Sequence, residues 1–285
     1  MQQTGTECEF SGSDSWVILS PIEQSIKRKI EAVGTPLKDW DINIYRGVLT
    51  GYNEAFIIST EKREEILANC QSEDERKRTA ELIRPILRGR DIKRYGYNWA
   101  NLWLINTHNG IRGKLERIHI EDYPAVKAHL DQYWDKISKR ADKGETPYNL
   151  RNCAYLEDFS KPKIVWGNLN LKPSYAIVED NSFINALSPM IVPASRYLLA
   201  ILNSKLADYF IRQLGVTRNG GYFEYKPMFI EQLPVPQCLD DSILKEIDTN
   251  VAIKNEKTID TIVYSLYGLN DEEIQYVEKG TQEKY

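Results

Sequence analysis

Cysteine and histidine are scarce in this chain, and their spacing suits neither a metal centre nor a disulfide framework. The 285 residues include four cysteines, no two of which are close in sequence, and three histidines that stand at no ligand-like spacing from them. Structural zinc sites use closely spaced cysteine and histidine pairs, and disulfide-stabilised domains are dense in cysteine. We therefore expect no bound metal, and a fold that depends on its hydrophobic core.

Long apolar runs are also missing. No stretch approaches the roughly 20 apolar residues of a membrane-spanning helix, and the N-terminus has no basic region followed by an apolar signal core. There is neither an internal repeat nor a low-complexity tract, which disfavours repeat architectures and disordered scaffolds. These absences predict a cytoplasmic globular protein with no membrane partner.

The charge of the chain is unevenly distributed. Hydrophobic residues make up 42% of the sequence and charged residues 27%, and the formal net charge is −4, which argues against indiscriminate coating of nucleic acid. Residues 76–94 nevertheless hold eight Lys or Arg against two acidic residues, whereas residues 239–285 hold five basic and eleven acidic residues. This pattern favours a body that faces a polyanion and an acidic tail, although a solvated charged surface would look the same.

The local signals predict an α/β (mixed α+β) body with a C-terminal helical segment. A capping box at Ser20 and Glu23 begins a helix that ends before Gly34. Further helices are expected over residues 60–71, 73–84, 121–143, 196–214, 243–267 and 272–279. Strands are expected over residues 16–19, 101–107, 163–166, 175–178 and 183–186, in a mixed sheet flanked by helices. Trp103, Trp134 and Trp166 are expected in the core.

A proline-rich exit at residues 233–236 indicates a domain edge. The sequence therefore divides into a connector strand and helix (1–40), an α/β domain (41–236) and a helical segment (237–285).

Residues 47–58 (Gly-Val-Leu-Thr-Gly-Tyr-Asn-Glu-Ala-Phe-Ile-Ile) are two apolar runs joined at a glycine-marked bend. Residues that favour β-strands lie on both sides, and glycine can adopt the backbone angles of a tight bend. We expect a strand, a bend and a second strand. The bend carries Thr50, Tyr52, Asn53 and Glu54. These side chains would either face a groove or simply solvate a hairpin tip.

This segment resembles the strand and turn near the start of the target-recognition region of TaqI-like DNA adenine methyltransferases and type IIG restriction-modification enzymes. Five further stretches match that region in order. They are the connector of residues 16–37, the Leu-Arg-Gly-basic-Asp-Ile-basic-basic-Tyr motif of residues 86–95, residues 148–166, residues 197–204 with the Gln-Leu-Pro-x-Pro exit of residues 230–236, and the Tyr-Gly-Leu helix pair of residues 259–273. The resemblance covers nearly the whole chain, although Leu-Asn-Ser and Leu-Pro-x-Pro also occur in type I specificity subunits.

The resemblance implies the specificity (target-recognition) domain of a larger polypeptide. The Asn-Pro-Pro-aromatic motif and the glycine-rich S-adenosylmethionine turn of these enzymes are both absent, so no catalytic residue is expected in this segment. S-adenosylmethionine and Mg²⁺ would serve the parent enzyme, through an N-terminal methyltransferase domain, with or without a nuclease domain, in the same polypeptide. Double-stranded DNA is the expected partner.

Two kinds of DNA contact are predicted, cations on phosphates and polar side chains on base edges. The candidates for phosphates are Arg88, Arg90, Lys93, Arg94, Arg151, Lys161 and Lys163. The candidates for bases are Tyr52, Asn53, Arg218, Asn219 and Tyr222. For the second group the competing interpretation is a flexible, solvated turn around Gly220 and Gly221.

Two other functions remain open at this point. Asp208, Glu224 and Lys226 could form a divalent-metal nuclease site, since carboxylates beside a lysine suit such chemistry. Alternatively, the chain could be a stand-alone specificity subunit that pairs with a separate methyltransferase through its helices at residues 121–143 and 243–267.

Overall fold

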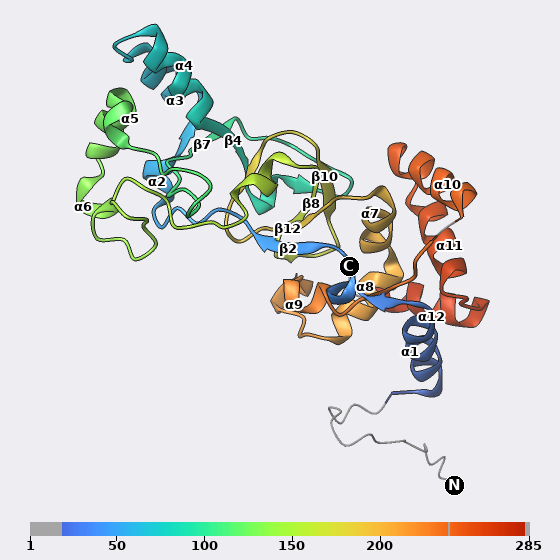
Figure 1. Cartoon of the computed structure of the whole chain (residues 1–285). Coiled ribbons are helices and arrows are strands. Elements are labelled where there is room, and N and C mark those ends of the chain that lie inside the picture. The colour runs from blue at the N-terminus through green and yellow to red at the C-terminus, as the bar shows by residue number, and fades with distance from the viewer. Residues whose placement is uncertain (1–18, 239, 283–285) are drawn as a thin grey trace.

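A computed structural model describes residues 19–238 and 240–282. Figure 1 shows an elongated arrangement, with α3 to α6 at one end, strands β2, β8, β10 and β12 in the middle, and α7, α8 and α10 to α12 with α1 at the other end. Most of the strand expected at residues 16–19 lies outside the described residues. No helix in the described part of the chain combines the length and the apolar character needed to cross a membrane.

Helix α1 (Pro21–Val33) confirms the first helix prediction. The Ser20 backbone N–H donates to the Glu23 carboxylate at 2.7 Å, and the Glu23 backbone N–H donates back to the Ser20 hydroxyl at 3.4 Å. This capping box satisfies two backbone donors that a helix start otherwise leaves unpaired. Ile26 and Ile30 turn inward from the helix into the core.

The central sheet is antiparallel and is covered on both faces. Its order is β10 (Tyr175–Val178), β8 (Lys163–Trp166), β12 (Pro189–Val192) and β2 (Asn43–Arg46). Every residue of β8 and β12 is buried, which is why these strands are nearly continuously apolar. Successive side chains point to opposite faces, so Ile164 joins one hydrophobic core and Val165 the other.

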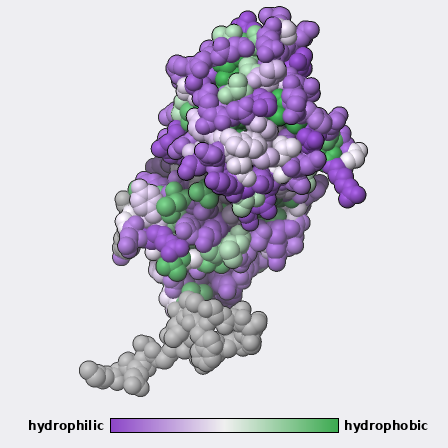
Figure 2. Space-filling view, turned by 90° about the vertical axis from the view of Figure 1, so that its left-hand side faces the viewer, coloured by the Kyte–Doolittle hydropathy of each residue, from purple (hydrophilic) through white to green (hydrophobic). Residues whose placement is uncertain are grey.

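The second sheet is mixed, so the strands expected in one mixed sheet are divided between two sheets, of which only this one is mixed. Its order is β11 (Phe183–Ile184), β4 (Ile83–Leu87), β7 (Leu102–Ile105) and β3 (Ile57–Ser59), with β11 parallel to β4 and the other pairs antiparallel. The helices on this side are α2 (Asn53–Phe56), α3 (Thr60–Ala68), α4 (Glu73–Leu82), α5 (Pro124–Asp131) and α6 (Trp134–Ile137). Seen from the end that carries α5 and α6, hydrophilic residues dominate the surface and hydrophobic residues form small separate groups (Figure 2).

Short strands and 3-10 turns complete this frame. The two-stranded pairs are β1 (Thr35–Pro36) with β14 (Pro234–Val235), β5 (Ile92–Lys93) with β6 (Gly96–Tyr97), and β9 (Leu169–Asn170) with β13 (Phe223–Glu224). The 3-10 turns are η1 (Leu37–Asp39), η2 (Gly89–Asp91), η3 (Ile120–Asp122), η4 (Leu156–Ser160) and η5 (Asn219–Gly221).

The helices at the other end share one core with the central sheet and α1. They are α7 (Arg196–Asn203), α8 (Lys205–Gln213), α9 (Pro227–Ile230), α10 (Asp241–Ala252), α11 (Glu256–Leu266) and α12 (Asp271–Gln282). Ile247, Ile259 and Val277 from the last three helices are buried in that core. The C-terminal helical segment is confirmed, while the division at residues 40 and 236 stays a prediction.

The hairpin prediction is wrong. Strands β2 and β3 belong to different sheets and do not pair, and the expected second strand begins with the single helical turn α2. Both halves have the strand-like composition that predicted a hairpin, but each finds its partners far away in the sequence. The segment between them is a crossing from one sheet to the other.

Three long helices were also predicted where the structure has breaks. The helix expected over 121–143 becomes η3, α5 and α6, because Pro124 begins α5 and Tyr133 leaves the helical conformation at φ −108° and ψ 12°. The helix expected over 196–214 breaks at Ser204, whose extended backbone and hydroxyl cap α8. The helix expected over 243–267 breaks between α10 and α11, where Lys254 adopts a positive φ of 55°.

The three tryptophans expected in the core differ in their burial. Trp166 is 1% exposed and confirms the prediction, and Trp103 is half-buried. For Trp134 the prediction is wrong, because its side chain is 44% exposed.

Candidate nucleic-acid interface

The basic motif at residues 86–95 contains two arginines whose side chains form ion pairs within the protein. Arg88 makes a two-pronged ion pair with the nearly buried Asp91, at 2.9 Å from Nε and 2.8 Å from Nη2. The hydrogen bond to Asp91 raises the pKa of Arg88 above its ordinary value. Arg94 pairs with Glu256 of α11 at 2.7 Å and donates to the Pro173 carbonyl at 3.1 Å. Both guanidinium groups therefore hold the turn and its neighbours in place.

Arg90 and Lys93 lie between these two arginines and are exposed. The Lys93 ammonium donates to the Arg90 carbonyl at 2.7 Å, which closes the turn without using a carboxylate. Neither side chain has an ion-pair partner within the described residues. Their charges are therefore available to a polyanion.

The other three predicted phosphate contacts differ in accessibility. Arg151 and Lys161 are exposed and pair with Asp142 at 3.0 Å and with Asp158 at 2.6 Å. Exposed pairs of this kind are worth little and exchange readily. For Lys163 the prediction of a phosphate contact is wrong, because its side chain is fully buried and donates to the carbonyl groups of Phe159 and Asp180.

Three chain segments lie side by side where the two sheets meet. The turn of residues 185–188, which we call the junction turn, links β11 to β12 and is flanked by residues 46–48 and 87–89. A Cβ atom on Gly47 would lie 2.4 Å from the Asn185 carbonyl oxygen, and one on Gly89 would lie 3.0 Å from Ser188 Oγ. These segments approach this closely because Gly47 carries no side chain.

The junction turn brings exposed side chains near the basic motif that the sequence did not single out. Arg46 is exposed and pairs in strand register with Pro189, directly after the turn. Leu187, at the tip of the turn, is also exposed. No local pattern marks these residues, because their exposure depends on how the two sheets meet.

Tyr52 and Asn53, the base-contact candidates on the bend of residues 47–58, lie on the side of the second sheet. The Asn53 side-chain oxygen accepts from the Thr50 hydroxyl at 2.6 Å, and the Tyr52 hydroxyl donates to Glu54 at 2.6 Å. Asn53 is exposed, while Tyr52 is half-buried beside Tyr133.

Arg140 fixes this bend, and sequence reasoning missed it. Its guanidinium is buried over the Phe56 ring and donates to the carbonyl groups of Thr50, Asp142, Pro147 and Asn149. Burial lowers the pKa of Arg140 to about 10. A residue expected within the helix of residues 121–143 thus ties the bend to the loop before Arg151.

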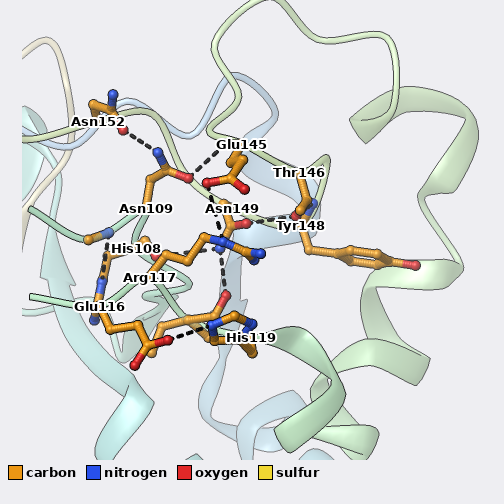
Figure 3. A network of polar contacts seen from close by, with 12 residues as sticks. His108, Asn109, Glu116, Arg117, His119, Glu145, Thr146, Tyr148, Asn149 and Asn152 are labelled. Carbon is orange, nitrogen blue, oxygen red and sulfur yellow. Dashed lines mark hydrogen bonds and ion pairs between the residues drawn. The ribbon is translucent and has the colours of Figure 1, made fainter. Parts of the chain in front are cut away.

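Side-chain amides tie the same loop to residues 108–119 (Figure 3). The Asn149 amide donates to the Ile118 carbonyl at 2.9 Å and its oxygen accepts from Thr146 at 2.7 Å. The Asn109 oxygen accepts from the Glu145 backbone N–H at 2.7 Å. Because these contacts satisfy the polar groups internally, they make the loops rigid rather than supplying a binding site.

The second glycine bend is a surface loop beside β9. Gly220 and Gly221 have positive φ values of 74° and 80°, and Arg218, Asn219 and Tyr222 are exposed. The Arg218 guanidinium lies 3.3 Å from Glu224. Since β13 pairs with β9, this loop lies next to residues 167–171, and Gly167 in turn contacts Gly89 of the basic motif. Residues 167–171 therefore lie between the basic motif and the loop of Arg218 and contact both.

The nuclease alternative is wrong in its geometry. Asp208 is fully buried and accepts from Arg212 Nε at 2.9 Å and from the Tyr225 hydroxyl at 2.8 Å. Glu224 points to the opposite face of the extended segment from Tyr225 and pairs with Lys226 at 2.7 Å on the surface. Asp208 and Glu224 therefore do not share a site. No group of three or more potential metal-ligating side chains occurs in the described part of the chain.

Comparison with known proteins identifies a family. The model of the TaqI-like C-terminal specificity domain matches residues 84–235. The type II methyltransferase M.PaeR7I of Pseudomonas aeruginosa is 21% identical over 272 residues, which is 92% of this chain and 44% of that protein. M.XhoI of Xanthomonas vasicola, also a type II methyltransferase, is 20% identical over 272 residues, which is 92% of this chain and 47% of that protein. The chain spans less than half the length of these two relatives.

Two solved structures share the fold. The type IIL restriction-modification enzyme MmeI in complex with DNA matches with a TM-score of 0.63 at 12% identity, over 88% of this chain and 36% of that chain. The type IIG restriction endonuclease BpuSI matches with a TM-score of 0.59 at 15% identity, over 91% of this chain and 32% of that chain.

Proposed function

Because the chain belongs to the family of TaqI-like C-terminal specificity domains, we propose that it binds double-stranded DNA and recognises a specific base sequence for a type II restriction-modification methyltransferase. The family match carries this proposal, since it contains both the basic motif and the loop of Arg218. The relatives are type II methyltransferases, and MmeI was solved with DNA bound. The chemistry would belong to the rest of the parent polypeptide, which would bind S-adenosylmethionine and, where it cleaves, Mg²⁺.

The proposed phosphate contacts are the predicted cations that the fold leaves exposed. Arg90 and Lys93 come first, because no carboxylate pairs with them in the described residues. Arg151 and Lys161 follow, because a phosphate can replace their weak surface partners. Arg88 and Arg94 serve indirectly, by holding the turn that presents Arg90.

The proposed base contacts are Asn53, Asn219 and Arg218, with Tyr52 and Tyr222 beside them. Asparagine can form paired hydrogen bonds to adenine, and arginine to guanine, in the major groove. The existing partner of Arg218 is a surface carboxylate, so exchanging it for a base edge removes no buried contact. Asn53 would give up the hydroxyl of the buried Thr50 in such an exchange. The positive φ angles at Gly220 and Gly221 support a tight bend that lets the backbone approach DNA.

Binding of the full chain to a randomised pool of duplexes tests this function. We expect one base sequence to be enriched, with an affinity that falls steeply between about 50 and 200 mM salt. The Arg90→Ala/Lys93→Ala variant should bind about tenfold or more weakly, with a salt slope smaller by about 2. The matched control is Arg76→Ala/Lys77→Ala, which removes the same charge from exposed positions on α4.

Two results would contradict the proposal. Binding without any sequence preference would refute target recognition. An equal loss of affinity in both double variants would show a net-charge effect and would refute the phosphate face at Arg90 and Lys93.

A further inference from the structure

Leu187 is the most exposed large hydrophobic side chain in the part of the chain that the structure describes. It is 84% exposed, ahead of Val216 at 77%. Single exposed hydrophobic residues are common on protein surfaces, so exposure alone carries no conclusion. The position of Leu187 at the meeting point of the two sheets makes it different.

The junction turn holds Leu187 rigidly. Within the turn, the Ser188 N–H donates to the Asn185 carbonyl at 2.9 Å, which closes a β-turn with Leu187 near its tip. On one side the Asn185 N–H donates to the Leu87 carbonyl at 2.9 Å, and on the other the Ala186 N–H donates to the Val48 carbonyl at 3.0 Å. Because the turn is bonded to both flanking segments, its backbone is held in place and presents the apolar side chain of Leu187 to solvent.

Two free cations flank the turn. Arg46 lies on the strand that pairs with Pro189, and Arg90 follows Gly89, whose backbone lies against Ser188. Both arginines are exposed and have no ion-pair partner within residues 19–238 and 240–282. An apolar tip between two unpaired cations suits a polyanion that also offers apolar surface, and duplex DNA has both charged phosphates and stacked bases.

We propose that Leu187 is an apolar wedge that inserts between two base pairs of the bound duplex while Arg46 and Arg90 hold the flanking phosphates. This inference rests on the proposed function. Apolar side chains inserted at a base step unstack it and bend the duplex, and the added contacts offset the cost of unstacking. A preorganised turn loses little freedom on insertion, whereas a flexible loop would lose much more.

The probe is a duplex enriched from the randomised pool by the full chain, labelled at its ends with a donor and an acceptor dye. The parent chain should bend it, which raises energy transfer, and should make one thymine reactive to permanganate. Leu187→Ala and Leu187→Gln should bind about five- to thirty-fold more weakly and lose both signals. Leu187→Met should retain them, because it keeps the apolar volume. Ile253→Ala, at a position 67% exposed beyond α10, is the matched control and should behave like the parent.

The outcomes separate the wedge from DNA recognition itself. Equal unfolding temperatures of the Leu187 variants and the parent check that the fold is kept, and Gln serves where Ala does not fold. A straight duplex with the parent, or unchanged bending and affinity in both Leu187→Ala and Leu187→Gln, overturns the wedge and leaves sequence recognition standing. Failure of the parent to enrich any duplex overturns the proposed function and the wedge with it.

Discussion

At the scale of single residues, burial decides what a charged side chain does. Lys163 stands in a basic segment and was predicted to contact DNA, but its ammonium is enclosed and donates to the carbonyl groups of Phe159 at 2.7 Å and Asp180 at 3.0 Å. Burial lowers the pKa of Lys163 from 10.5 to about 8. The same residue type at position 93 is exposed on the surface.

The lowered pKa of Lys163 predicts a pH-dependent stability. The unfolded chain keeps this proton to about pH 10.5 and the folded chain releases it near pH 8, so the unfolded state binds more protons between these values. Raising the pH through this window therefore stabilises the fold. Between about pH 7 and 9.5, the free energy of unfolding of the parent should rise by roughly 1–2 kcal/mol more than that of Lys163→Met.

Urea denaturation at both pH values measures this difference. The tyrosines titrate alike in both proteins, so their contribution cancels in the comparison. Parallel pH profiles for parent and variant would contradict a buried, proton-releasing lysine.

At the scale of elements, the close crossing of chain segments outweighs local patterning. Residues 47–58 have the composition of a hairpin, yet β2 and β3 belong to different sheets. The segment between them passes close to the backbone of Asn185, and Gly47 makes this approach possible because it has no side chain. Likewise, the helix expected over residues 196–214 divides at Ser204, which begins a new helix by capping it.

Gly47→Ala should be strongly destabilising. Its Cβ would lie 2.4 Å from the Asn185 carbonyl oxygen, a backbone atom that is held by the junction turn. We expect a loss of about 2 kcal/mol or more in the free energy of unfolding. Gly280→Ala is the matched control, because a Cβ there meets nothing within 4 Å and the residue lies in α12. That variant should gain roughly 0.5–1 kcal/mol, and equal effects of the two changes on chemical denaturation would contradict the crossing geometry.

At the scale of the whole molecule, the central sheet separates two hydrophobic cores. Ile164 and Ile191 face the core of α1, α7, α8 and α10 to α12, while Val165 and Met190 face the core of the second sheet. The acidic C-terminal helices therefore belong to the core on the side of α1, α7 and α8. Arg94 of the basic motif pairs with Glu256 of α11.

This packing predicts that a chain ending at residue 236 does not fold cooperatively. Removing residues 237–285 would expose the apolar surface that Ile247, Val263 and Val277 cover. Domains are stable by only about 5–15 kcal/mol, and each large apolar side chain that loses its burial costs about 1.5–3 kcal/mol, so losing several of these contacts is enough to unfold the chain. Near-ultraviolet circular dichroism and urea denaturation would measure the effect, and adding residues 237–285 as a separate peptide should restore structure. Parent-like cooperative unfolding of the truncated chain would instead support the boundary predicted at residue 236.

Local chemistry in the sequence predicted the parts that depend on neighbours along the chain. The capping box at Ser20, the helix expected from residue 73 and the apolar runs at residues 163–166 and 175–178 each formed the expected element. The ordered motifs also identified the family. These signals act over a few residues, or are carried by their order, so no knowledge of the packing was needed.

Sequence by itself determined the mixed α/β class, the family and the set of cations and loops from which a DNA contact would be drawn. Only the tertiary structure decided which of these cations are paired with Asp91 and Glu256 or buried against backbone carbonyls, and that Arg90 and Lys93 remain exposed. It also decided that Arg46 and Leu187, which no local pattern marks, are exposed near them. The physical reason is that burial and charge pairing depend on which segments, far apart in the sequence, lie against one another when two sheets meet.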